Sequence, residues 1–470
     1  MSVDTNNAAF QDALNLIQYT RQSVFLTGKA GTGKSTFLRY VCEHTKKKHV
    51  VLAPTGIAAI NAGGSTMHSF FKLPFYPLLP DDPNLSLQRG RIHEFFKYTK
   101  PHRKLLEQIE LVIIDEISMV RADLIDAIDR ILRVYSHNLR EPFGGKQLLL
   151  VGDVFQLEPV VKNDEREILN RAYPTPYFFS ARVFSQIDLV SIELQKVYRQ
   201  TDSVFVSVLD HIRTNTAGAA DLQLLNTRYG SHIEESEADM YITLATRRDT
   251  VDSINEKKLA ELAGEPITFE GSIEGDFPES SLPTSQELVL KPGAQIIFIK
   301  NDFDRRWVNG TIGVIAGIDE EEETIYVITD DGKECDVKRE SWRNIRYRYN
   351  EKTKEIEEEV LGSFTQYPIR LAWAITVHKS QGLTFSRVVI DFTGGVFAGG
   401  QAYVALSRCT SLDGIQLKKP INRADIFVRP EIVNFAGRFN DRQAIDKALK
   451  QAQALSLIHI SEPTRRSYIS

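Results

Sequence analysis

Short apolar runs of strand length alternate with amphipathic segments along the first 180 positions of the chain. Apolar residues recur at helical spacing over 8–19, which predicts a helix, and a strand-like run follows at 24–28. Further buried strands are predicted at 49–53, 110–114 and 147–151. An amphipathic helix is predicted around 124–135. This alternation predicts a doubly wound α/β domain with a parallel sheet.

A second αβ-patterned region begins near residue 189 and is interrupted. Positions 266–292 are rich in Pro, Ser, Glu and Gly and predict a loop or insertion. Alternating apolar and polar positions then predict strands at 294–299, 311–318 and 324–329. The αβ pattern resumes at 369 and includes a strand at 388–391. The interruption therefore predicts a small β-barrel inserted into a second α/β domain.

Composition limits the class of protein. With 470 residues, 42% hydrophobic and 25% charged, the chain has the make-up of a globular protein of about three domains. No apolar run approaches the roughly 20 residues that span a bilayer, and the first residues do not form a secretory signal. We therefore expect no membrane partner and a cytoplasmic, nucleoid-associated location.

Charge and cysteine usage narrow the chemistry further. A net charge of −5 argues against coating of duplex DNA and confines any nucleic-acid site to a local basic channel. The cysteines, Cys42, Cys335 and Cys409, lie far apart and form no CxxC pair. We therefore predict neither a disulfide framework nor a zinc or iron–sulfur site.

A glycine-rich loop lies between the strand at 24–28 and a helix. The segment Gly28–Thr36 reads GKAGTGKST. Its glycines allow successive N–H groups to surround a phosphate at the helix N-terminus. Lys34 then reaches the β- and γ-phosphates and the Ser35 hydroxyl ligates Mg²⁺. The plain alternative is a turn that only joins a strand to a helix.

Polar residues follow the next buried strands at the expected sheet edge. Asp115 and Glu116 end one strand, and we expect Asp115 to hold Mg²⁺ and Glu116 to activate the attacking water. Gln156 follows another strand and is a candidate sensor of the γ-phosphate, supported by Asp153. Arg408 follows a helix-like segment and is a candidate arginine finger.

Several segments suit nucleic acid but have structural alternatives. The turns at 53–59 and 63–71 offer hydroxyls, amide groups, His68 and Phe70 for phosphate contact and stacking, although packing explains the aromatics equally well. The prolines between Leu73 and Pro83 predict a stiff, irregular protrusion. The basic and aromatic stretch 88–104 fits either a nucleic-acid backbone or a solvated surface.

Eight motifs occur in a fixed order and resemble those of superfamily-one helicases of the Pif type, with RecD-like helicases as near relatives. They are GKAGTGKS, APTGIAA, STMHSFF, IIDEISMV, GDVFQLEP, VYRQ, TVHKSQGLTF and YVALSR. The resemblance covers roughly residues 10–430. The region 118–152 is similar to the signature that separates Pif-type from RecD-like members. Glu158 departs from the proline that many relatives have there.

The resemblance implies an α/β fold of two RecA-like P-loop NTPase domains with parallel sheets. It implies a strand-separating wedge in the first domain and a small Src-homology-like β-barrel in the second. The implied division is a first domain 1–183 with the wedge at about 64–100, a second domain 184–250 and 366–430, an insertion 251–365 and a C-terminal helix 431–454. Residues 455–470 read as a translated sequencing adapter and are set aside as an artefact.

The resemblance also implies roles for individual residues. Catalysis falls to Lys34, Asp115, Glu116, Gln156, Arg199 and Arg408. Nucleotide contacts fall to Gln11 (the adenine-reading glutamine), Gly28, Gly31, Thr32, Gly33, Lys34, Ser35, Thr36 and Gly382, and Mg²⁺ contacts to Ser35 and Asp115. DNA contacts fall to Thr55, Gly56, Thr66, His68, Phe70, His378 and Lys379.

The predicted function is ATP-dependent, Mg²⁺-dependent 5′→3′ translocation on single-stranded DNA with duplex unwinding. The partners are single-stranded DNA and single-/double-strand junctions, and the expected working unit is a monomeric, compact bacterial-type core. G-quadruplexes and RNA–DNA hybrids stay open as substrates, as do roles in DNA repair, recombination and telomere maintenance. The alternatives are a DNA-stimulated ATPase that translocates without strand separation, a RecD-like recombination helicase, and a single-strand binding module with an inert nucleotide site. Intact Lys34, Asp115, Glu116 and Arg408 count against the last.

Overall fold

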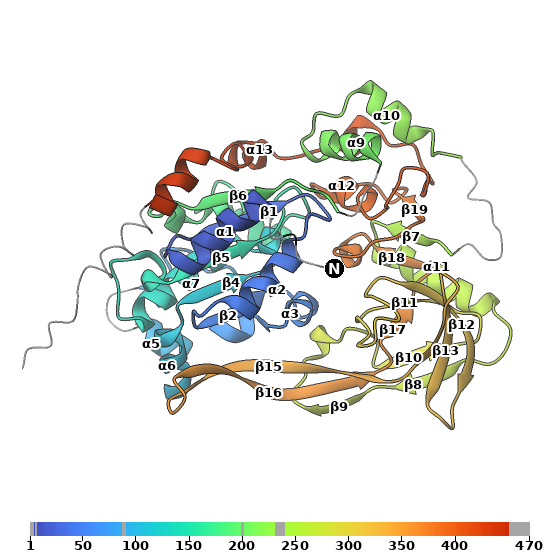
Figure 1. Cartoon of the computed structure of the whole chain (residues 1–470), viewed down its shortest axis with the longest axis horizontal. Coiled ribbons are helices and arrows are strands. Elements are labelled where there is room, and N and C mark those ends of the chain that lie inside the picture. Colours follow the sequence, from blue (N-terminus) through green and yellow to red (C-terminus); the bar gives the residue numbers. More distant parts are fainter. Residues whose placement is uncertain (1–3, 5–6, 87–90, 199–201, 231–239, 451–470) are drawn as a thin grey trace, which may run out of the picture.

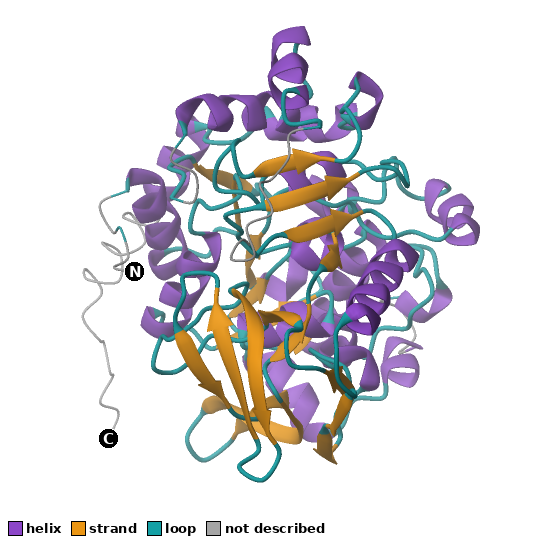
Figure 2. Cartoon of the chain, turned by 90° about the vertical axis from the view of Figure 1, so that its right-hand side faces the viewer, coloured by secondary structure: helices purple, strands orange, loops and turns teal. Residues whose placement is uncertain are grey.

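The structure, a computed structural model, describes residues 4, 7–86, 91–198, 202–230 and 240–450. Two parallel-sheet domains lie side by side, and an antiparallel β domain lies beside the second (Figure 1). Figure 2, which views the right-hand side of Figure 1, shows the strands of the inserted domain below the second parallel sheet. None of the helices within the described residues has both the length and the apolar composition needed to cross a bilayer.

The first sheet contains six parallel strands in the order β3-β2-β4-β5-β1-β6. The strands are β1 (Val24–Gly28), β2 (His49–Ala53), β3 (Ser65–Thr66), β4 (Leu111–Ile114), β5 (Gln147–Val151) and β6 (Val190–Leu194). Crossovers place β5 between β1 and β4. The loops that follow these three strands therefore meet at one edge of the sheet.

Helices cover both faces of this sheet because its strands are apolar on both sides. Val24 and Leu26 pack on the core under α1 and α2, whereas Phe25 points into the core under α7. The helices of this domain are α1 (Ala8–Tyr19), α2 (Lys34–His44), α3 (Gly56–Ala62), α4 (Met67–Phe71), α5 (Arg91–Phe96), α6 (Lys100–Gln108), α7 (Ala122–Tyr135) and α8 (Asn163–Asn170).

The second sheet has four parallel strands in the order β18-β7-β19-β20. They are β7 (Ile242–Ala245), β18 (Ala374–Thr376), β19 (Val388–Asp391) and β20 (Ile415–Leu417). The helices that follow or flank them are α9 (Ser203–Arg213), α10 (Ala219–Asn226), α11 (Arg248–Glu261) and α12 (Gln401–Leu406). Helix α13 (Pro430–Ala436) follows β20 in the chain but packs on the core of the first domain through Ile432 and Phe435. Two parallel sheets flanked by helices confirm the predicted fold class.

The inserted domain is built on an antiparallel sheet of order β14-β13-β12-β11-β17. Its strands are β8 (Ile267–Glu270), β9 (Ser272–Gly275), β10 (Glu287–Leu290), β11 (Gln295–Phe298), β12 (Ile312–Asp319), β13 (Thr324–Thr329), β14 (Glu334–Val337), β15 (Glu340–Asn350), β16 (Glu355–Gln366) and β17 (Ile369–Leu371). Strands β8, β9 and β10 lie in the stretch 266–292, so of the two predicted alternatives it is part of the insertion rather than a loop. These strands form because β8 pairs with β10 and β9 pairs with the distant β16.

A long hairpin, β15–β16, reaches from the inserted domain back under the first domain (Figure 1). One face of β15 places Ile345, Tyr347 and Tyr349 in the core of the first domain. The N–H of Val51 donates a hydrogen bond of 3.2 Å to the Tyr347 hydroxyl. Tyr347 and Tyr349 therefore join the inserted domain to the first domain. Arg346 and Arg348, on the opposite face of β15, are exposed.

Three predicted domain boundaries need correction. Strand β6 pairs with β1, so the first sheet extends beyond residue 183. Helix α11 stays with the second sheet, because Asn255 Nδ2 donates to the Ala374 carbonyl and the Ala374 N–H donates to Asn255 Oδ1, both at 2.9 Å. The insertion therefore starts after α11 rather than at 251, and it ends with β17 rather than at 365 because β17 pairs with β11.

The predicted C-terminal helix 431–454 is interrupted. Helix α13 ends at Ala436, and a second helical stretch covers 442–450. Asn440 between them has a left-handed backbone (φ 56°), and its Oδ1 accepts a hydrogen bond of 2.8 Å from the Glu193 N–H on β6. This attachment to the sheet edge breaks the helix. The adapter-like residues 455–470 lie outside the described residues.

Candidate nucleotide and DNA site

The glycine-rich loop between β1 and α2 has the backbone shape of a phosphate cradle. Gly31 and Gly33 adopt left-handed φ angles of 79° and 89°, where a Cβ is disfavoured. Lys34 Nζ donates to the carbonyls of Gly28 (2.7 Å) and Lys29 (3.0 Å). The Thr32 hydroxyl closes the loop by donating to the Lys29 carbonyl at 2.9 Å. Ser35 and Thr36 are exposed on the first turn of α2, at its positive N-terminal end.

Asp115 and Glu116 stand directly after β4. Glu116 has a left-handed backbone (φ 49°), and its N–H donates to Asp115 Oδ1 at 2.9 Å. Burial and the neighbouring Asp115 carboxylate raise the pKa of Glu116 to about 7, although Lys34 and Arg408 oppose the shift. Burial also raises the pKa of Asp115, opposed by its hydrogen bond from Glu116 and by Lys34. A carboxyl group with a pKa near neutrality suits a general base.

Gln156 and Asp153 occupy the loop after β5, between the cradle and the two acids. Gln156 Nε2 donates to Asp153 Oδ2 at 3.4 Å. Asp153 is 1% exposed and Gln156 is 9% exposed. The structure therefore gathers Lys34, Asp115, Glu116 and Gln156 at one sheet edge, with Asp153 bonded to the glutamine.

Arg408 approaches this edge from the second domain. It follows α12 and is 1% exposed, and its charge lowers the pKa of Glu116. Its guanidinium donates to the carbonyls of Val404 (3.0 Å), Ser380 (3.4 Å) and Leu383 (3.4 Å). These bonds fix the cation on the second domain, within electrostatic range of Glu116. Arg199, the other predicted arginine, lies outside the described residues.

Three contacts from the second domain to the loops after β1 and β5, here called the nucleotide loops, were not predicted. The Ala30 N–H donates to the Tyr403 hydroxyl, Lys29 forms an ion pair with Asp210, and Arg213 Nη2 donates to Asp153 Oδ1. The partners are separated by 60 to 373 positions, so no local spacing signals them.

Gln11 lies on the first turn of α1, beside the helix that follows the cradle. Its neighbour Phe10 contacts Phe37 and Tyr40 of α2 edge-on, with ring centroids 4.9 and 5.5 Å apart. On the other side of the loop, the Tyr198 N–H donates to the Gly31 carbonyl at 2.9 Å. Gln11 and Tyr198 therefore lie on segments that contact the cradle and its helix.

The two threonines predicted to contact DNA are helix N-caps. The hydroxyls of Thr55 and Thr66 accept from the N–H groups of Ala58 (3.2 Å) and Ser69 (3.1 Å). Gly56 faces the inserted domain, where a Cβ would meet the Ser281 side chain at 2.2 Å. These caps place the N-termini of α3 and α4 near the same edge of the first sheet.

His68 and Phe70 on α4 have different environments. The His68 ring stacks on Phe75 with centroids 4.9 Å apart and planes 9° apart, and Phe75 is 83% exposed. Burial and the charge of Arg121 lower the pKa of His68. Phe70 is 3% exposed in the core, so its predicted role as a base-contacting residue is wrong. The exposed ring is Phe75.

The remaining predicted DNA residues come from the second domain. His378 and Lys379 lie on a short 3₁₀ turn, η7 (His378–Ser380), and Gly382 follows with φ 79°. The His378 ring stacks on Phe397 at 6.5 Å, and burial lowers its pKa. Partial desolvation of the Lys379 ammonium group, followed by the charges of Arg370 and Arg248, lowers its pKa, although the residue is still accessible to solvent.

The proline-rich segment is only partly a protrusion. Leu73 and Leu78 are 4% and 0% exposed, and the Leu78 N–H donates to Asp123 Oδ2 on α7 at 3.0 Å. The exposed large apolar side chains of the segment are Phe75 and Tyr76, at its tip. Apolar packing and the hydrogen bond to Asp123 anchor the segment between its prolines.

The basic and aromatic stretch 88–104 also packs inward. Residues 87–90 lie outside the described residues. Phe96 and Tyr98 are both 2% exposed, and burial lowers the pKa of His102 to about 4. Among the described residues of this stretch, Phe96 and Tyr98 therefore belong to the core, whereas Arg91, Lys97 and Lys100 are exposed.

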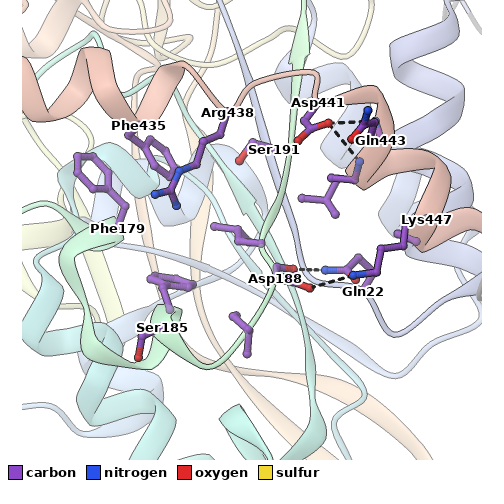
Figure 3. Close-up of a pocket in the computed structure, with 16 residues that line it drawn as sticks. Gln22, Phe179, Ser185, Asp188, Ser191, Phe435, Arg438, Asp441, Gln443 and Lys447 are labelled. Carbon is purple, nitrogen blue, oxygen red and sulfur yellow. Dashed lines mark hydrogen bonds and ion pairs between the residues drawn. The ribbon is translucent and has the colours of Figure 1, made fainter.

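A cavity lies away from the sheet edge that carries the predicted site residues. A pocket of about 550 Å³ is enclosed by the segment before β6 and the C-terminal segment (Figure 3). Gln22, Asp188, Arg438 and Lys447 line it, and Phe179 and Phe435 stack at its side with centroids 4.4 Å apart. None of the predicted site residues lines this pocket.

The PIF1-like helicase family model matches residues 4–217. The ATP-dependent DNA helicase Pif1 of Campylobacter jejuni is 33% identical over 412 residues, which cover 84% of this chain and 88% of that protein. The chain belongs to the PIF1-like helicase family. The predicted resemblance to Pif-type helicases is thereby confirmed.

Solved structures of this helicase family share the fold. The crystal structure of Bacteroides sp Pif1 in complex with ADP-AlF4 is 41% identical, covers 92% of this chain and 96% of that chain, and superposes with a TM-score of 0.84. The Bacteroides Pif1 structure bound to ssDNA has the same identity, covers 93% of this chain and 97% of that chain, and has a TM-score of 0.65. The chain thus superposes better on the nucleotide-analogue complex than on the ssDNA-bound structure. The structure of unliganded Pif1 from Bacteroides sp gives a TM-score of 0.82, so the arrangement does not depend on a bound nucleotide analogue.

Proposed function

We propose that this chain hydrolyses ATP between its two parallel-sheet domains and uses the cycle to move 5′→3′ along single-stranded DNA. ATP-dependent DNA unwinding is the activity of the family to which the chain belongs, as the sequence predicted. The direction of movement rests on the family resemblance alone. The cytoplasmic location stays a prediction from the sequence.

The convergence of Lys34, Glu116 and Arg408 carries the proposal. Lys34 and Glu116 come from the first domain and Arg408 from the second, and both cations lower the pKa of Glu116. A triphosphate at the cradle would contact Lys34 and draw Arg408 towards its γ-phosphate. Because the two domains supply opposite sides of the site, binding favours their contact and release of phosphate weakens it.

In this proposal Glu116 orients and deprotonates the attacking water. Its raised pKa keeps the carboxyl group able to take up a proton near neutral pH. Gln156, hydrogen-bonded to Asp153, contacts the γ-phosphate side. Gln11 reads the adenine edge from α1, and Arg199 adds a second cation.

The oxygen donors of Ser35 and Asp115 fit Mg²⁺, which prefers hard oxygen ligands. Ser35 is exposed on the first turn of α2, and Asp115 ends β4 beside Lys34. When bound, Mg²⁺ supplies charge that neutralises the phosphates. The protein's own contribution is to present these oxygens from two fixed elements.

Single-stranded DNA is proposed to cross both domains along the helix N-termini of α3 and α4 and the η7 turn. The Thr55 and Thr66 caps orient N–H groups at these ends, which suits phosphate contact. Lys379 adds positive charge and Phe75 an exposed stacking face. The Phe75–Tyr76 tip serves as the wedge at a single-/double-strand junction, and the chain acts as a monomer.

Strand displacement on duplexes with either a 5′ or a 3′ overhang, measured beside DNA-stimulated phosphate release, tests this function. We expect unwinding of the 5′-overhang substrate and DNA-stimulated turnover. Unwinding only from 3′ overhangs would overturn the direction. Turnover with movement but without strand separation would favour a translocase, and absence of DNA-stimulated turnover would favour an inert binding module.

A further inference from the structure

Helix α9 presents two oppositely charged side chains to the nucleotide loops of the other domain. Asp210 and Arg213 are three positions apart and therefore lie on one face of the helix. Its opposite face, with Phe205, Val208 and Ile212, packs in the core of the second domain. The charged side chains of α9, a helix packed in the second domain, thus contact loops of the first domain.

Arg213 is a buried cation held by two carboxylates of the first domain. Its side chain is 4% exposed. Nη2 donates to Asp153 Oδ1 at 3.1 Å and Nη1 donates to Glu193 Oε1 at 2.8 Å. The guanidinium also lies over the Phe155 ring, 4.4 Å from its centroid. The planar fork of arginine suits these three contacts, and lysine cannot reproduce them.

Asp153 connects Arg213 to Gln156. One carboxylate oxygen of Asp153 accepts from Arg213, and the other accepts from Gln156 Nε2 at 3.4 Å. Asp153 Oδ1 also accepts from the Phe155 N–H at 3.2 Å, so this oxygen is shared between its own loop and Arg213. The orientation of the Gln156 amide therefore depends on a carboxylate that the second domain holds.

The second charge on α9 supports the same contact. Asp210 forms an ion pair with Lys29, which lies within the phosphate cradle and whose carbonyl accepts from Lys34 Nζ. The Lys29 and Asp210 side chains are 25% and 33% exposed, respectively, so water screens this ion pair more than it screens the buried Arg213 contacts. The Arg213 bridge is therefore the less screened of the two connections.

We propose that Arg213 is a positioning residue for Gln156: from the second domain it fixes Asp153, so the glutamine is held in place only while the two domains are in contact. This inference rests on the proposed role of Gln156 at the γ-phosphate. In this way, contact between the two domains sets the orientation of Gln156 in the loop after β5. The bridge is broken when the domains separate, because its donor and acceptor belong to different domains.

A double-mutant cycle on DNA-stimulated ATP turnover by the full chain tests the proposal. Arg213→Lys keeps the cation and loses the fork, so we expect kcat to fall about tenfold while the KM for ATP stays within about threefold. In the Gln156→Ala background, Arg213→Lys should lower kcat no further. Residues that only stabilise the fold would instead lower kcat by the same factor in both backgrounds.

Two further variants make the test decisive. Asp153→Asn should reproduce the kcat loss of Arg213→Lys, and in the Gln156→Ala background it should lower kcat no further. If Arg213→Lys does not fold, Asp153→Asn takes its place in the cycle. Lys257→Gln, which removes an exposed cation from α11 of the same domain, should leave kcat unchanged. Wild-type kcat in Arg213→Lys, or multiplying losses in the double variants, would overturn the proposal.

The cycle also separates this inference from the function on which it rests. If Gln156→Ala turns over ATP at the wild-type rate, the proposed role of Gln156 fails and the inference fails with it. If Gln156→Ala is impaired and both Arg213→Lys and Asp153→Asn are not, only the inference fails.

Discussion

The N–H of Ala30, in the phosphate cradle, donates a hydrogen bond of 3.1 Å to the hydroxyl of Tyr403 on α12 of the other domain. Tyr403 is 3% exposed, and burial raises the pKa of its phenol, so the hydroxyl stays protonated. A loop shaped to surround phosphate is therefore also a point of contact between the two domains. Together with Arg213 and Asp210, Tyr403 connects the second domain to the loops after β1 and β5 of the first.

Replacing Tyr403 should weaken ATP binding more than the chemical step. Tyr403→Phe removes one interdomain hydrogen bond, which contributes about 1 kcal/mol. We expect the KM for ATP to rise about fivefold with kcat within about twofold, measured by steady-state phosphate release. Tyr229→Phe, at a half-exposed tyrosine of the same domain, is the control. An unchanged KM would show that the bond does not stabilise domain contact.

Binding and hydrolysis should separate at Glu116. Glu116→Gln removes the proposed base and should lower kcat by about 10²- to 10⁴-fold, while a fluorescent ATP analogue binds within about threefold of wild type. Lys34→Ala should abolish turnover and weaken nucleotide binding, because it removes the cation at the phosphates. Equal loss of binding and hydrolysis in Glu116→Gln would contradict its role as base.

Turnover should depend on pH near neutrality. The active form of Glu116 is the carboxylate, and its pKa is raised to about 7, so kcat should fall as pH falls through about 7. Phosphate release measured from pH 5.5 to 8.5 tests this. The residual activity of Glu116→Gln should lack this titration. A wild-type profile that is flat across pH 7 would refute the assignment.

The same pKa shift should affect stability in the opposite direction. Between its ordinary value of 4.5 and about 7, Glu116 binds more protons in the folded than in the unfolded chain, so its contribution to stability falls as pH rises. Urea unfolding of wild type and Glu116→Gln across this range should show the decline in wild type only. If the free energy of unfolding declined equally with pH in both proteins, the decline would come from titratable groups other than Glu116.

The exposed tip of the proline-rich segment should affect unwinding without affecting ATP hydrolysis. Deleting 73–83 would remove buried Leu73 and Leu78, whereas Phe75→Ala changes only an exposed ring. We expect Phe75→Ala to slow strand displacement about tenfold and to leave DNA-stimulated ATPase within about twofold. Phe303→Ala, at a 96% exposed ring of the inserted domain, is the matched control. Unwinding by Phe75→Ala at the wild-type rate would show that Phe75 is not part of the strand-separating wedge.

Asp123 should be important for stability. Its carboxylate is fully buried, pairs with Arg121 at 2.9 Å and accepts from the Leu78 N–H. Asp123→Ala leaves the cation and the amide without this partner and should cost about 3–5 kcal/mol in urea unfolding. Asp188→Ala, at a 91% exposed side chain, should cost less than about 0.5 kcal/mol. A loss for Asp123→Ala of the size seen in the control would contradict the buried network.

Much of the first domain follows from local sequence. The predicted helix 8–19 matches α1, and the predicted strands match β1, β2, β4 and β5. Their signals are local: periodic apolar residues, and glycines such as Gly31 and Gly33 at positions of positive φ. The signals for the predicted chemistry are also local, because Lys34 and Ser35 begin the helix after β1, and Asp115 and Glu116 directly follow β4.

Helix α7 marks where local signals end. The sequence predicts an amphipathic helix, yet its polar residues Asp123, Asp126, Asp129 and Arg133 are buried and satisfied by partners such as the Phe143 N–H and the Tyr173 hydroxyl. Similarly, nothing in the segment 68–75 distinguishes the buried Phe70 from the exposed Phe75. Burial depends on which distant segment packs above a side chain.

The sequence by itself determined the phosphate cradle, the acids that act with it and the alternation of strands and helices, because each depends on conformations and spacings within a few residues. Only the tertiary structure decided that β5 lies between β1 and β4, and that β6 extends the first sheet beyond 183. Only it revealed that Arg213 and Tyr403 reach across to Asp153 and Ala30. Such pairings join residues up to 373 positions apart, and they form because packing of whole domains brings them together rather than because of any local spacing.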